Sequence, residues 1–309
     1  MSETTSKGAE LLDRAVLARV GNLPLCARRA MIGSVSGRHR SPHRGSSVEF
    51  AEYRSYVPGD DLRRLDWRAY GRSDRFYVKE FEADTNLRLV LVVDASGSMK
   101  YAGEQGRGTR TKLDVARSLS AVLAQIALRQ SDAAGLWVAD DADRRNRIPP
   151  RRKPSHLRAI LAELASLEPE GSTSLVETLH LAAEQEQRRA LFVVISDLFA
   201  PPEELKGAFQ HLAYRNHDVA VFHLLDRDEL EFRFDRPTRF VDPEGGATIV
   251  ADPSTVARKY LAALKRYRDA LDEVVRTADL DHHEVLLDAD LGQVVADFLT
   301  GRAGSGARS

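Results

Sequence analysis

The sequence has little of three things: cysteine, net charge and long apolar segments. Its 309 residues contain one cysteine, Cys26, which excludes an internal disulfide and a thiolate-rich zinc site. Lysine and arginine number 45 against 46 aspartate and glutamate, so no overall charge draws the chain onto nucleic acid or anionic lipid. No apolar run reaches the ~18 residues that span a bilayer, and the N-terminus lacks the apolar core of a signal peptide. We therefore expect a cytoplasmic protein without a membrane span.

Two catalytic signatures are also missing. No Gly-x-Ser-x-Gly turn occurs, and no histidine is placed by a motif to activate a serine, so acyl transfer is unsupported. Gly103, Gly106 and Gly108 resemble part of a phosphate loop, but the Gly-Lys-Ser/Thr ending is absent. Apolar residues nevertheless make up 43% of the chain, which is enough for a sizeable core in one large domain or two modest ones.

From residue 87 onward, strand patterns alternate with helix patterns. The run 89–93 is Leu-Val-Leu-Val-Val, which is typical of a central strand covered on both faces. Residues 111–130 then carry apolar side chains at helical spacing, with Lys112 and the other charged residues largely off that stripe. Further strand patterns lie near 135–139, 190–196, 218–225 and 284–287, and a hairpin-like pattern lies near 232–250. The alternation predicts an α/β fold with a doubly wound, mainly parallel sheet.

The first 85 residues differ in composition from the rest. Residues 28–79 carry twelve basic and six acidic residues and are rich in turn-forming glycine, serine and proline. We therefore divide the chain into a loop-rich accessory region at 1–85 and an α/β domain at 86–309. The basic stretch is either a docking surface for an acidic partner or a solvated face whose charges pair internally. A second basic run, 144–153, contains two prolines and predicts an exposed loop.

Oxygen-bearing side chains follow the predicted central strands, where open α/β sheets bind ligands. Asp94, Ser96 and Ser98 come directly after one strand, Asp197 follows another, and Thr173 lies in a glycine-started loop before a helix. Two carboxylates, three hydroxyls and waters make an all-oxygen shell that suits Mg²⁺ or Mn²⁺. In the alternative, structural interpretation, Asp94 caps the following turn and the hydroxyls satisfy helix N-termini. Two converging aspartates repel each other without a cation, which favours the metal site.

These five residues resemble the metal-ion-dependent adhesion site (MIDAS) of von Willebrand factor A domains. Asp94-x-Ser96-x-Ser98 is followed by Thr173 and Asp197, which lie 79 and 103 residues after Asp94. The resemblance implies a von Willebrand factor A-like fold from about residue 86 and a divalent cation bound by all five residues.

Motifs ahead of this site resemble the bacterial domain-of-unknown-function 58 (DUF58) family. They are Gly37-x-His39-x-Ser41, Gly45-x-Ser47-x-Glu49-Phe50, Arg54-x-Tyr56-x-Pro58-Gly59-Asp60-Asp61, Asp66-Trp67 and Val78-Lys79-x-Phe81. Members of that family carry an A domain and are often encoded beside MoxR-type AAA+ ATPases, so the resemblance implies such an ATPase, or its client, as a partner. Many relatives carry N-terminal transmembrane helices, a feature that this sequence does not share.

A hydroxyl-rich shell leaves a divalent ion electrophilic, so a carboxylate from a partner protein fits its remaining position. We therefore predict a metal-dependent protein-interaction module, an adaptor or co-chaperone rather than an enzyme, with no nucleic-acid partner. Arg63 and Arg64 are candidates for steering an acidic partner. Two alternatives stay open: a metal-dependent phosphoester hydrolase, for which no general base stands at a defined spacing, and a structural A domain with an empty site.

Overall fold

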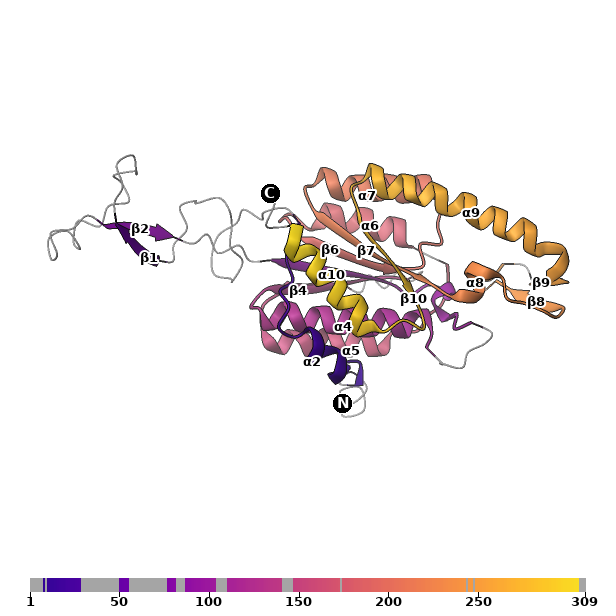
Figure 1. Cartoon of the computed structure of the whole chain (residues 1–309), viewed down its shortest axis with the longest axis horizontal. Coiled ribbons are helices and arrows are strands. Elements are labelled where there is room, and N and C mark those ends of the chain that lie inside the picture. Colours follow the sequence, from indigo (N-terminus) through magenta and orange to yellow (C-terminus); the bar gives the residue numbers. More distant parts are fainter. Residues whose placement is uncertain are drawn as a thin grey trace.

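The computed structural model describes residues 8, 10–28, 50–55, 77–81, 87–103, 110–140, 147–172, 174–242, 244–246 and 248–305. Its main body is a six-stranded sheet with helices on both faces (Figure 1). In spatial order the strands are β10 (Asp281–Leu286), β7 (Asp218–Leu225), β6 (Leu191–Ser196), β3 (Arg88–Asp94), β4 (Ala133–Ala139) and β5 (Arg147–Arg151). All neighbouring pairs are parallel except β4–β5. The predicted doubly wound, mainly parallel sheet is confirmed.

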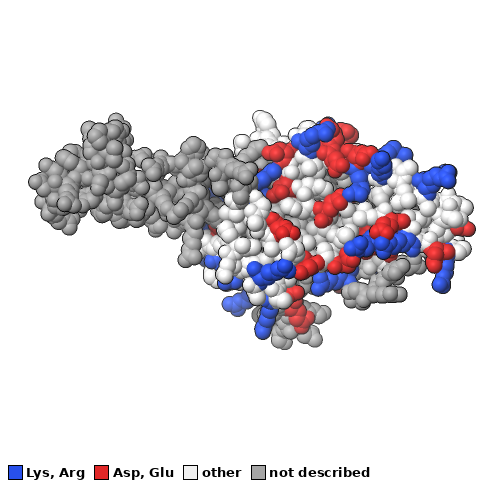
Figure 2. Space-filling view, viewed as in Figure 1, with Lys and Arg blue, Asp and Glu red and all other residues white. Residues whose placement is uncertain are grey.

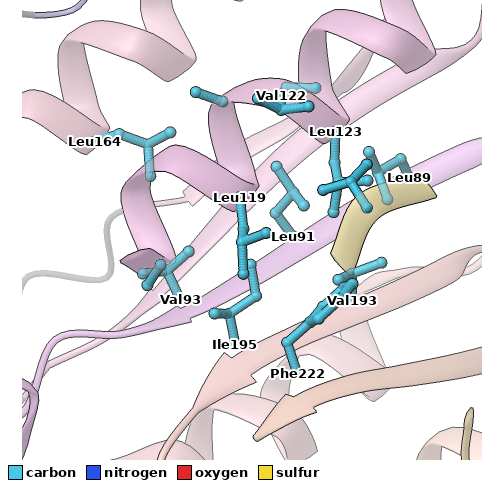
Figure 3. Packing of buried hydrophobic residues seen from close by; sticks show 14 of the residues in the cluster. Leu89, Leu91, Val93, Leu119, Val122, Leu123, Leu164, Val193, Ile195 and Phe222 are labelled. Carbon is cyan, nitrogen blue, oxygen red and sulfur yellow. The ribbon is translucent and has the colours of Figure 1, made fainter. Parts of the chain in front are cut away.

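Strand β3 lies at the centre of the sheet because both of its faces are apolar. Leu89, Leu91 and Val93 pack on one face, and Val90 and Val92 pack on the other, all with no exposed surface. Figure 3 shows the first set meeting Leu119 and its neighbours on the covering helix. Each such side chain contributes ~1.5–3 kcal/mol when fully buried, so a strand of this composition is most stable between two helical layers.

Two helical layers supply that cover. One layer holds α2 (Arg14–Val20), α4 (Lys112–Arg129), α5 (Pro154–Ser166) and α10 (Leu291–Ser305). The other holds α6 (Leu175–Gln185), α7 (Pro202–Tyr214) and the C-terminal half of α9 (Pro253–Thr277). Helix α4 begins with a complete capping box, in which the Thr111 hydroxyl accepts from the amide of Asp114 and the Asp114 carboxylate accepts from the amide of Thr111. This box satisfies two backbone N–H groups and fixes where the helix starts.

Part of the N-terminal region packs on this body. Val16, Val20 and Leu25 are buried in the same cluster as α4 and α10, and Arg19 pairs with Asp290 at 2.8 Å. Two short strands, β1 (Phe50–Ser55) and β2 (Tyr77–Phe81), pair antiparallel with each other. The division of the chain at residue 85 stays a prediction.

The basic run at 144–153 was expected to be an exposed loop. The loop assignment was wrong for residues 147–151, and residues 144–146 lie outside the described residues. Arg147–Arg151 forms β5, which pairs antiparallel with β4 at the edge of the sheet. Pro149 and Pro150 are compatible with this strand because an edge strand can leave its amide positions unpaired on the outer side. The guanidinium of Arg147 lies over the ring of Trp137 on β4, with its Cζ 4.9 Å from the centroid of that ring.

A small projecting unit lies beyond the carboxyl ends of the strands (Figure 1). It comprises α8 (Arg227–Glu231) and a hairpin of β8 (Thr238–Val241) and β9 (Thr248–Ala251), which confirms the predicted hairpin. None of the helices in the described ranges combines the length and apolar character that a membrane crossing requires.

Candidate metal site

The site lies where the winding of the sheet reverses. Strands β4 and β5 follow β3 on one side, and β6, β7 and β10 lie on the other. A crevice forms at such a switch point, outside the carboxyl ends of the two strands that flank it. Asp94 ends β3, and Asp197 directly follows β6. The topology therefore brings two carboxylates that are about a hundred residues apart in sequence to one position.

Asp94 is completely buried and is held by neutral donors of Ser96 and Ser196. Its Oδ1 accepts from the amide of Ser96 at 3.0 Å, and its Oδ2 accepts from the hydroxyl of Ser196 at 2.6 Å. Burial and the nearby charge of Asp197 together raise the pKa of Asp94 to about 6. No basic side chain of the described ranges forms an ion pair with Asp94. Within those ranges this buried carboxylate therefore has no cationic partner, and its charged form is costly in a protein interior.

The two serines of the Asp-x-Ser-x-Ser loop complete a connected cluster. The Ser96 and Ser98 hydroxyl oxygens lie 3.1 Å apart, and the Ser98 hydroxyl also hydrogen-bonds the Asp197 carboxylate. Ser96 precedes a short 3-10 helix, η2 (Gly97–Lys100), yet its side chain makes no capping bond to that helix. The structural interpretation therefore holds for Asp94, which accepts from the turn amide, and is wrong for Ser96. The serine hydroxyls point into the cluster instead. The third hydroxyl of that interpretation, that of Thr173, belongs to a residue outside the described ranges.

The glycine-started loop lies beside the serine loop. The Gly97 amide donates to the Gly171 carbonyl at 2.9 Å, and the Glu170 amide donates to the Ala95 carbonyl at 3.1 Å. Gly171 has φ +73°, a left-handed conformation that side chains other than glycine rarely adopt. Thr173, the fifth predicted ligand, lies outside the described residues, as do Arg63 and Arg64.

Lys112 is the residue that sequence reasoning missed. Its Nζ lies 2.9 Å from Asp197 Oδ2 and 2.6 Å from Glu229 Oε1, and its side chain is only 3% exposed. Burial alone would lower the pKa of Lys112, but the charges of Asp197 and Glu229 outweigh it and raise that pKa. Likewise, burial favours a raised pKa at Asp197, whereas the Lys112 ammonium holds it below its usual value. The Asp197 Oδ1 accepts from the amide of Phe199 at 3.3 Å.

The prediction that Lys112 lies off the buried face of α4 was therefore wrong. One signal could have identified it. Lys112 is the first residue of α4, where the positive end of the helix dipole disfavours a cation. A lysine in that position needs nearby anions, and here one of them lies 85 residues away in sequence and the other 117.

The donor set fits a hard divalent cation. Asp94, Asp197, Ser96 and Ser98 offer carboxylate and hydroxyl oxygens only, which are the ligands that Mg²⁺ and Mn²⁺ prefer. Within the described ranges, no group of three or more histidine, cysteine, aspartate or glutamate side chains is placed to hold a metal. A site with two carboxylates and several hydroxyls is thus the arrangement that these residues support.

Residues 52–270 match the model of the family described as "Protein of unknown function DUF58". The matched segment covers more than two-thirds of the chain and contains Asp94, Lys112 and Asp197. The chain belongs to the DUF58 family. The family resemblance carried by the upstream motifs is thereby confirmed, and the DUF58 match extends through the projecting unit into α9.

Two mycobacterial proteins are similar to this DUF58 chain. The uncharacterized protein Rv1480 of Mycobacterium tuberculosis is 28% identical over 223 residues, which are 71% of this chain and 68% of that protein. The uncharacterized protein Mb1516 of Mycobacterium bovis gives the same values. Neither name assigns an activity.

Several solved structures are similar at low sequence identity. The conserved hypothetical protein BatB of Bacteroides thetaiotaomicron has a TM-score of 0.47 at 18% identity and covers 71% of this chain and 100% of that chain. An aerotolerance-related membrane protein of Bacteroides fragilis has a TM-score of 0.44 at 15% identity, covering 72% and 100%. The SpRpn10 VWA domain has a TM-score of 0.38 at 11% identity, covering 72% and 97%. The fold assignment for this chain rests on its own sheet order.

Proposed function

We propose that this DUF58 chain is a protein-interaction module that binds its partner through a divalent cation. The ligands would be Asp94, Ser96, Ser98 and Asp197, with Thr173 as the fifth. The observation that carries the proposal is the buried Asp94 carboxylate, which lies beside a second carboxylate and has neutral donors only. A cation at this position would offset the repulsion between the two aspartates.

The serine hydroxyls support this role because they are not consumed elsewhere. Ser96 makes no cap to η2, and its hydroxyl contacts that of Ser98 within the cluster. Ser98 and Asp197 retain 9% and 7% exposure, so these two residues of the cluster are not completely closed off from solvent. When bound, Mg²⁺ or Mn²⁺ supplies an electrophilic position for a carboxylate that approaches from outside.

The charge states of the site favour binding over hydrolysis. A hydrolase needs a general base that is unprotonated yet basic near neutral pH. Lys112 has a raised pKa and stays protonated, and the lowered pKa of Asp197 makes it a weak base. Asp94 has a pKa of about 6, but in this proposal its carboxylate is an ion ligand and does not serve as the base. We therefore propose a role without catalysis. Turnover of a phosphoester that Mg²⁺ supports and Asp94→Ala abolishes would instead establish the hydrolase.

We further propose a MoxR-type AAA+ ATPase, or a client that it remodels, as the partner, with this chain as adaptor or co-chaperone. Membership of the DUF58 family is the support for this choice. The test is association of the purified full-length chain with a MoxR-type AAA+ ATPase from the same organism, measured in Mg²⁺ and in chelator.

Single-ligand variants sharpen this test. Ser96→Ala and Ser98→Ala should each weaken association ~10-fold or more, because each removes an ion ligand without removing core. Ser166→Ala, at the exposed end of α5, is the matched control and should bind as wild type. Equal association in chelator would place the contact elsewhere.

A further inference from the structure

The hairpin and the first half of α9 form an arm that projects past the metal site. We define the arm as β8, β9 and residues 253–268. Helix α9 has 25 residues, so it is ~37 Å long, whereas the 8 residues of β7 span ~26 Å. Leu271 and Val274 of its second half pack on the sheet, and the first half overhangs the carboxyl edge (Figure 1).

Contacts to Glu229 tie the arm to the metal site. The Glu229 carboxylate accepts from Lys112 at 2.6 Å, and the same ammonium contacts Asp197. The backbone carbonyl of Glu229 accepts from the Tyr260 hydroxyl on α9 at 2.9 Å. The arm is therefore linked to Asp197 through Tyr260, Glu229 and Lys112.

An aromatic cluster holds one face of the hairpin. Phe232 stacks on Phe240 with ring centroids 5.8 Å apart, and it also lies 4.8 Å from Tyr260. Phe234 meets Phe240 edge to face at 5.1 Å. Offset and edge-to-face contacts of this kind stabilise aromatic pairs beyond the effect of area burial. The hairpin is therefore a supported element that presents its opposite face outward.

That opposite face combines apolar and basic side chains. Cross-strand partners share a face, so Arg239 with Val250 and Val241 with Thr248 lie opposite Phe240. We call these four residues the outer face. All four are exposed, with Val250 at 72% and Val241 at 56%. Both valines are β-branched residues that a solvated hairpin does not require at these positions, and exposed apolar groups that lie together mark interaction surfaces.

The arm is also basic in a chain that is nearly neutral. Residues 232–268 contain eight basic and four acidic residues, and residues 253–268 contain five basic residues and no acidic one. Figure 2 shows blue side chains at the end of the molecule that holds α9 and the hairpin. An acidic partner would be attracted here and oriented toward the ion site.

We infer that the arm docks an extended segment of the partner protein that is rich in acidic and apolar residues. One carboxylate of the segment would reach the ion, and its neighbours would lie along the outer face. Apolar side chains would contact Val241 and Val250, and acidic ones would pair with Arg239 and the basic half of α9. The hairpin has two strands, so the segment can add as a third strand through backbone hydrogen bonds. This inference rests on the proposed function.

Peptide selection on the full-length protein provides the test. A random peptide display library is selected on wild type in Mg²⁺, and the affinity of one enriched, labelled peptide is then measured by fluorescence anisotropy. We expect enrichment of peptides that combine Asp or Glu with apolar residues. The double variant Val241→Ser, Val250→Ser should weaken binding of that peptide ~10-fold or more, and Arg239→Glu should weaken it in the same direction.

Two controls identify the cause of any loss. Tyr214 is the last residue of α7, and its side chain is 84% exposed. It lies just before the start of β7, at the edge of the sheet opposite the metal site, so Tyr214→Ser should bind the peptide as wild type does. The double variant should also bind Mg²⁺ in calorimetry with wild-type affinity, because neither valine is among the proposed ion ligands at Asp94 and Asp197. Enrichment of basic peptides, or wild-type affinity of the double variant, would overturn the inference.

The outcomes separate the arm from the ion. Peptide binding that needs the arm and survives chelator would support the arm and refute the metal-dependent function. Binding that needs Mg²⁺ and ignores the arm variants would refute the arm alone. Self-association of wild type that the double variant abolishes, or RNA binding lost with Arg239→Glu, would assign another occupant and overturn the inference.

Discussion

Replacing Lys112 with methionine should make the protein less stable without metal and more responsive to it. The ammonium is 3% exposed and contacts carboxylates at 2.9 and 2.6 Å. Removing one member of a buried ion pair typically costs ~3–5 kcal/mol, because the remaining charge stays buried. For a domain of this size, 1 kcal/mol corresponds to ~2–4 °C, so the metal-free melting temperature should fall by roughly 6–20 °C.

The same change should tighten ion binding. Two unit charges 4 Å apart repel by ~1 kcal/mol even in water, and a divalent ion doubles that value to ~2 kcal/mol. Removing the ammonium should therefore lower the Kd for Mg²⁺ by ~30-fold. Lys112→Met should accordingly show a larger rise in melting temperature on adding Mg²⁺ than wild type shows.

Calorimetric scanning and Mg²⁺ titration measure both effects. Lys153→Met removes one exposed positive charge at the start of α5 and controls for net charge. Lys112→Arg retains a cation at the network and should keep the affinity for Mg²⁺ nearer to that of wild type. An unchanged or weaker affinity in Lys112→Met would refute the claim that this lysine competes with the ion.

Three further predictions follow from other parts of the molecule. Asp94→Asn should raise the metal-free stability by ~1–3 kcal/mol at pH 7 in calorimetric scanning. Burial and Asp197 raise the pKa of this aspartate to about 6, so its ionised form destabilises the fold. Burial lowers the pKa of His217 to about 4, below the unfolded value of ~6.5, so the stability contributed by neutral His217 is complete above pH ~6.5 and is lost as the pH falls toward 4. In denaturant titrations across that pH range, the free energy of unfolding should fall less steeply with acid for His217→Asn than for wild type. An identical pH dependence in the two proteins would contradict the lowered pKa of His217. Gly135→Ala should destabilise the β4–β5 edge, since an added Cβ would lie 2.7 Å from the Pro150 backbone nitrogen. Amide hydrogen exchange in β5 of the variant at the same rate as in wild type would contradict this.

The fold could be predicted because its signals are local. The run at β3 is apolar on both faces, a pattern typical of a covered central strand. The helical periodicity of the next segment then predicted α4. The position of Asp94 and Asp197 also followed, because carboxyl ends of parallel strands meet at one edge. These features depend on residues that are close in sequence or on the order of strands.

The features that were missed depend on distant contacts. Lys112 belongs to the site because Glu229 and Asp197 come from α8 and the end of β6. Strand β5 forms because β4 offers it an open edge, although its own sequence of prolines and arginines is typical of a loop. Periodicity within one segment carries no information on such partners.

Calorimetric titration of Mg²⁺ and Mn²⁺ into the full-length chain tests directly whether the cluster at Asp94 and Asp197 binds a metal. We expect saturable binding to one site in wild type, and none in Asp94→Asn, whose circular dichroism should match that of wild type. Wild type that binds neither ion, or Asp94→Asn that binds as tightly as wild type, would contradict the assignment of this cluster as a metal site.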